Sequence, residues 1–134
     1  MIRKILETHS ALKMREETLF LAVYILDMYL SKKVIRNKDV DLLLVTIIFI
    51  AAKYEETIYV KLFKILNGYK IRLEPPQVIL FEAEVLAVLD FKLNIVCPYD
   101  FLKRIFLIQK IEDKNFSSIK SCVLFLHFGS HFIP

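Results

Sequence analysis

A nearly continuous apolar run from Leu42 to Ala52 constrains the fold of this 134-residue chain more than any other feature. The run is closed by Asp41 and Lys53, and it is well short of the roughly 20 apolar residues that cross a bilayer. A helix that is apolar on most of its faces has to be surrounded by other elements. We therefore expect a central buried helix inside a bundle, and no association with a membrane.

The rest of the chain also favours helices, because hydrophobic residues make up 56% of it while glycine occurs only twice and proline four times. So few turn residues do not suit a fold of many short strands, and an all-α fold is predicted. Asn37 is expected to cap the central helix, and Asn67-Gly68 to end the next one in a left-handed turn. The apolar periodicity predicts helices at about 1–12, 16–33, 37–54, 60–66, 75–89, 99–109 and 119–127, with a loop at 112–118.

The formal net charge is +4, and the basic residues are scattered along the chain. Such a distribution is too diffuse for a nucleic-acid footprint, so direct nucleic-acid binding is not expected. The favoured interpretation of the densest basic group is a solvated helix end and loop, and the alternative is a nuclear-import signal. This group consists of Lys32, Lys33, Arg36 and Lys38.

No pattern in the sequence predicts an enzyme, a cofactor or a metal site. Glu55 and Glu56 are adjacent carboxylates expected to be solvated, which does not suit hydrolysis, and the pair His127 and His131 lacks a third ligand. The two cysteines form no disulfide framework and the N-terminus shows no signal-peptide pattern. We therefore expect a protein of the nucleus, the cytoplasm or both.

Three segments carry a resemblance to a known family: ETLFLAVYILDMYLSKKVI, IIFIAAKYEE and ILFEAEVLAVLDFKLNIVCPYDFLKR. In order and spacing they resemble the cyclin box of B-type, mitotic and related cyclins, over about residues 5–106. Against that family the chain is shortened at both ends. The resemblance implies a five-helix cyclin fold around a central helix at 1–96, followed at 97–134 by about two helices of a second cyclin box.

The resemblance also implies a function, which is to bind and activate a cyclin-dependent protein kinase. It implies that Lys53 donates hydrogen bonds to backbone carbonyls beside the regulatory helix of the kinase, and that Glu82 accepts from nearby backbone amides. Without the resemblance, Lys53 would be interpreted as a charge favourable to the helix dipole, and Glu82 as the partner of Lys53 or another lysine. The complete kinase-binding set implied is Lys53, Tyr54, Glu55, Glu56, Glu82, Leu86, Phe91 and Leu93.

Two other functions remain open for a chain of this kind. One is a cyclin-fold adaptor of the transcription machinery, which should show a strong, salt-dependent affinity for DNA. The other is a cyclin that binds a kinase without activating it. Apolar surface left exposed by a shortened second box could also lead to self-association.

Overall fold

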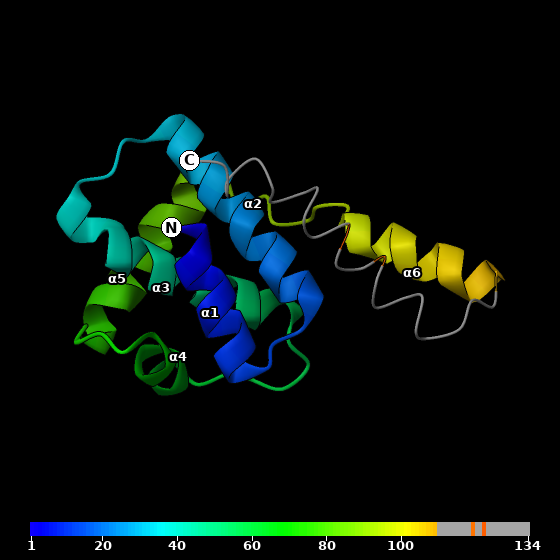
Figure 1. The fold of residues 1–134 in the computed structure, drawn as a ribbon. Coiled ribbons are helices and arrows are strands. Elements are labelled where there is room, and N and C mark those ends of the chain that lie inside the picture. Colours follow the sequence, from blue (N-terminus) through cyan, green and yellow to red (C-terminus); the bar gives the residue numbers. More distant parts are fainter. Residues whose placement is uncertain (110–118, 120–121, 123–134) are drawn as a thin grey trace. The chain divides into compact units, whose positions relative to one another are not determined.

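The computed structural model describes residues 1–109, 119 and 122. The contacts divide the chain into two compact units, Met1–Ile95 and Val96–Pro134. This division falls one residue before the boundary expected from the sequence. Within the described residues every regular element is helical (Figure 1), which confirms the predicted all-α fold.

The first unit contains five α-helices and one short 3₁₀ turn, η1. The first two helices and the central one begin and end within a few residues of the predicted positions, because their apolar periodicity is long and regular. The observed elements are α1 (Ile2–Leu12), α2 (Glu16–Lys32), η1 (Asn37–Asp39), α3 (Val40–Glu55), α4 (Leu62–Tyr69) and α5 (Pro75–Val88).

Helix α3 is the centre of this unit. All of its residues from Leu43 to Ala52 are buried, and it contacts each of the other four helices. The one polar side chain in this stretch, Thr46, donates its hydroxyl hydrogen bond to the carbonyl of Leu42 at 2.7 Å, so it is buried without an unsatisfied group. The apolar run therefore forms the central helix that the sequence predicted.

Two predicted helix ends are wrong. Asn37 does not cap α3; it lies in η1, and α3 begins only after Asp39. Asn67 and Gly68 do not end α4 but lie inside it, and the left-handed residue that follows the helix is Lys70, with φ 57°. Gly68 faces α1 inside the helix, and a Cβ at its position would stand 3.4 Å from the side chain of Leu12.

Helix α5 begins at the predicted proline pair. Proline lacks an N–H donor, but this costs nothing in a first turn, where N–H groups have no helical partner. The amide of Glu74 donates to Oε1 of Gln77 at 3.3 Å, which holds the chain at the start of the helix. After α5 the chain turns sharply through Asp90 and Phe91, both with positive φ. The amide of Phe91 donates to the carbonyl of Leu86 at 3.0 Å, which closes the turn at the end of α5.

The described part of the second unit is chiefly α6 (Pro98–Gln109), close to the helix predicted there. Within α6, Lys103 pairs with Asp100 at 3.4 Å. The predicted loop at 112–118 and the final helix at 119–127, with His127 and His131, lie outside the described residues except for single positions. Among the residues described, no helix is both long and apolar enough to cross a membrane, and no cluster could hold a metal ion.

Candidate protein-binding surface

Two charged side chains from adjacent helices meet at the surface of the first unit. Lys53 lies in the last turn of α3 and Glu82 in the middle of α5, and Nζ of the lysine stands 2.5 Å from Oε1 of the glutamate. The lysine side chain is 41% exposed and the glutamate side chain 14%. Glu82 thus has the lysine partner predicted for it. The pair is partly exposed to solvent and is not enclosed in the core.

The ion pair leaves bonding capacity for a partner. The Lys53 ammonium has three donors and the Glu82 carboxylate has two oxygens, of which the pair itself uses one each. The ammonium also lies 4.8 Å from the centre of the Phe49 ring, which holds it over the end of α3. The surface therefore presents donors and an acceptor in fixed positions, an arrangement suited to main-chain groups of another protein.

The predicted apolar residues follow the two charged residues in the sequence, Tyr54 after Lys53, and Leu86, Phe91 and Leu93 after Glu82. Tyr54 is 51% exposed and Phe91 is 69% exposed, while Leu86 and Leu93 are partly buried. Sequence reasoning missed Ile79, which is 55% exposed and precedes Glu82 by one helical turn. Its spacing of three residues from Glu82 and seven from Leu86 places all three on one face of α5, and this periodicity was the available signal.

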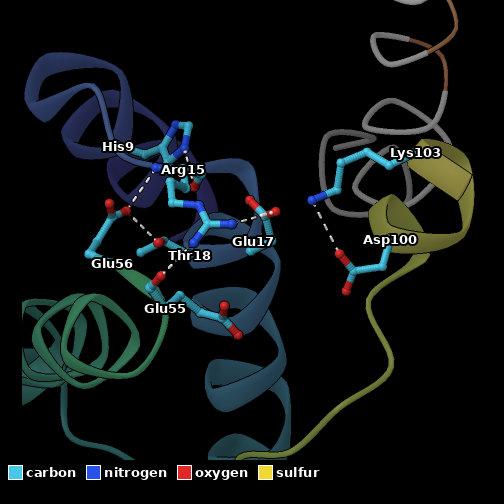
Figure 2. A network of polar contacts seen from close by, with 8 residues as sticks. All are labelled: His9, Arg15, Glu17, Thr18, Glu55, Glu56, Asp100 and Lys103. Atoms are coloured by element: carbon cyan, nitrogen blue, oxygen red, sulfur yellow. Dashed lines mark hydrogen bonds and ion pairs between the residues drawn. The ribbon is translucent and has the colours of Figure 1, made fainter. Parts of the chain in front are cut away.

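Glu56, by contrast, accepts hydrogen bonds from other residues of the same unit. Its Oε1 accepts a hydrogen bond from the amide of Arg15 at 2.8 Å and another from the hydroxyl of Thr18 at 2.5 Å (Figure 2). The Arg15 guanidinium donates to the carbonyl of Glu55 at 2.9 Å and pairs with Glu17 at 3.0 Å. The expectation of solvated loop carboxylates is therefore wrong for Glu56, which caps the N-terminus of α2 from the end of α3.

Replacing Glu56 with alanine is expected to lower the free energy of unfolding by about 1–2 kcal/mol. The amide of Arg15 at the start of α2 and the buried hydroxyl of Thr18 would both lose their hydrogen-bond acceptor. Chemical denaturation followed by circular dichroism measures the change. Glu7→Ala is the matched control, because Glu7 is exposed on α1 and makes no ion pair within residues 1–109. Equal effects of the two substitutions would contradict a capping role.

A second ion pair joins α2 to α5 outside this surface. Nζ of Lys33 stands 2.7 Å from Oε1 of Glu84, and the hydroxyl of Tyr29 donates to the same oxygen at 3.5 Å. Burial, together with the charge of Glu84, raises the pKa of Tyr29, so the phenol stays neutral. Lys32 and Arg36 are also bonded, to the carbonyl of Val88 and to Asp39. Three of the four cations in the densest basic group therefore serve to hold the fold together.

This helical architecture agrees with a family match. Residues 1–94 match the family described as "Cyclin, N-terminal domain", which is more than half of the chain. The chain therefore belongs to the cyclin family.

Its relatives include mitotic cyclins from animals and fungi. The chain is 35% identical over 100 residues to "G2/mitotic-specific cyclin-B3" of Mus musculus, covering 75% of this chain and 7% of the relative. It is 34% identical over 114 residues to "G2/mitotic-specific cyclin CLB2" of Candida albicans, covering 85% and 23%. For "G2/mitotic-specific cyclin cdc13" of Schizosaccharomyces pombe the identity is 34% over 101 residues, covering 75% and 21%. The chain thus spans less than a quarter of the length of each of these three relatives.

Proposed function

We propose that the chain is a non-enzymatic regulatory subunit that binds and activates a cyclin-dependent protein kinase in cell-cycle control, in the nucleus, the cytoplasm or both. The observation that supports this most directly is the Lys53–Glu82 pair, which combines free donors and an acceptor with exposed apolar neighbours. In the proposed complex the lysine donates to backbone carbonyls of the kinase and the glutamate accepts from backbone amides. Contacts to the main chain do not depend on the side chains of the partner.

The apolar side chains supply the remainder of the proposed contact. Tyr54, Leu86, Phe91 and Leu93 are the anchors expected from the sequence, and Ile79 extends the same face of α5. Binding energy in such interfaces is concentrated in a few desolvated anchors around the polar contacts. Glu55 and Glu56 contribute indirectly in this proposal, since the bonds of Glu56 and of the Glu55 carbonyl tie the end of α3 to the start of α2.

Activation in this proposal is a shift between two arrangements of the kinase. The cyclin binds the arrangement in which the regulatory helix is moved inward, so that its glutamate pairs with the lysine of the ATP site. The cyclin adds no catalytic group to phosphoryl transfer. The segment 97–134 is proposed to be the beginning of a second cyclin box.

Mixing the purified chain with cyclin-dependent kinases, and measuring both complex formation and phosphorylation of a substrate peptide, tests the proposal. A complex with increased phosphorylation is the expected result. A complex without phosphorylation would replace the proposal with a cyclin that binds without activating. Retention on DNA that weakens with salt, in the absence of a kinase complex, would instead indicate an adaptor of the transcription machinery.

A further inference from the structure

One arginine joins the start of α2 to the end of α3, the helix end that carries Lys53. Arg15 directly precedes α2, and it bonds to the end of α3 through both its backbone and its side chain. Its amide donates to Oε1 of Glu56 at 2.8 Å, and its guanidinium donates to the carbonyl of Glu55 at 2.9 Å (Figure 2). Glu55 is the last residue of α3 and Glu56 is the residue after it, so Arg15 bonds to both sides of the helix boundary.

A carboxylate at the start of α2 holds the guanidinium in this position. Nη2 of Arg15 stands 3.0 Å from Oε1 of Glu17, whose side chain is only 9% exposed. A carboxylate that is shielded from water makes a stronger bond than one in solvent. The planar guanidinium reaches Glu17 with Nη2 and the carbonyl of Glu55 with Nη1, a fixed fork that the single ammonium of a lysine does not provide.

The backbone of Arg15 is held as well. Its carbonyl accepts a hydrogen bond from Nε2 of His9 on α1 at 2.9 Å. The oxygen of Glu56 that binds its amide also accepts from the hydroxyl of Thr18 on α2. Because bonds from α1, from α2 and from the end of α3 converge here, the donor that Arg15 presents to α3 has a defined position.

The last turn of α3 contains residues of the proposed binding surface. Carbonyl groups of a last turn have no partner within their own helix, and helix ends open more readily than helix centres. Here the carbonyl of Ala52 accepts from the first amide after the helix at 3.0 Å, and the carbonyl of Glu55 accepts from the guanidinium of Arg15. Lys53 and Tyr54 lie between these two bonded carbonyls in the sequence, so their positions depend on this turn.

We propose that Arg15 is a positioning residue for kinase binding, which holds the last turn of α3 in the conformation that presents Lys53 and Tyr54 to the kinase. This inference rests on the proposed function and adds to it a residue that acts through the contact residues. Without the guanidinium the last turn opens more often, and Lys53 loses its fixed position beside Glu82. The kinase must then order this turn on binding, which weakens the complex.

Arg15→Ala tests the inference, because it removes the guanidinium but keeps the backbone amide that bonds to Glu56. Calorimetric titration with a cyclin-dependent kinase should show binding about five-fold weaker than for the wild type. In a Lys53→Ala background the same substitution should cost less than about twofold, because the side chain that it positions is gone. Arg15→Lys keeps the charge without the planar fork, and its affinity should lie between those of Arg15→Ala and the wild type.

Arg36→Ala is the matched control, since Arg36 pairs with Asp39 at 2.8 Å next to the opposite end of α3. Its loss should leave kinase binding unchanged, and circular dichroism should show all variants folded. A second readout uses the chain without kinase. Hydrogen exchange followed by mass spectrometry should be faster at residues 53–57 in Arg15→Ala than in the wild type, and unchanged at residues 43–50.

A wild-type complex together with unchanged affinity of Arg15→Ala overturns the inference and leaves the proposed function standing. An equal loss from Arg15→Ala with and without Lys53, or an equal loss from Arg36→Ala, also overturns it, because either indicates a general effect on the fold. Unchanged hydrogen exchange at residues 53–57 does the same. Absence of any complex between the wild type and a kinase contradicts the proposed function, and the inference is then rejected with it.

Discussion

Lys53→Ala is expected to weaken kinase binding by about 2 kcal/mol, roughly 30-fold, and Glu82→Ala by a similar amount. Each substitution removes hydrogen bonds to the kinase backbone in the proposed complex. Each substitution also leaves the other charge without its ion pair. This cost is larger in Lys53→Ala, because the glutamate left unpaired is only 14% exposed. Isothermal titration calorimetry or biolayer interferometry against the kinase identified by the mixing experiment measures the loss.

The Lys33–Glu84 pair provides the matched control, since it joins α2 to α5 at nearly the same distance but is about half exposed on both sides. Lys33→Ala and Glu84→Ala should each change kinase binding by less than about 0.5 kcal/mol, the range of a solvated pair. The double variant Lys53→Ala with Glu82→Ala should lose less than the sum of the single losses, because the two residues share one interaction. Similar losses from both pairs would show that the Lys53–Glu82 surface has no particular part in binding.

The sequence predicted the helices well wherever one apolar face or run is long. Leu42 to Ala52 could form only a buried helix, and the prolines marked the start of α5. The ends of α4 could not be predicted, because Gly68 indicates a helix end in the local pattern but lies inside α4, facing Leu12 of α1. That choice depends on tertiary packing, which local pattern does not contain.

For the candidate site, the sequence could indicate the Lys53–Glu82 pair because a carboxylate among apolar residues on α5 needs a partner. It could not indicate the bonds of Glu56 to Arg15 and Thr18, because these join residues about 40 positions apart through the joint between α1 and α2. The same limit applies to a recess lined by Lys4 and Glu7 of α1 and by Tyr69 of α4, which exists only where these two helices meet. Long-range polar contacts depend on the folded positions of both partners.

The largest effect on stability is expected at the centre of α3. Leu44 is fully buried, and Leu44→Ala should lower the free energy of unfolding by about 3 kcal/mol, because it removes apolar contacts and leaves a cavity that neighbours fill only in part. Urea denaturation followed by far-UV circular dichroism measures this difference.

Leu80→Ala on α5 is the control, since this leucine is 75% exposed and its loss should cost less than about 0.5 kcal/mol. A cost for Leu44→Ala no greater than that of Leu80→Ala would contradict the central position of α3. The comparison bears on function too, because the helix whose buried side chains hold the unit together also carries Lys53 at its end. Loss of packing at Leu44 should therefore weaken kinase binding in proportion to the unfolded fraction, and adding kinase should raise the denaturation midpoint again by mass action.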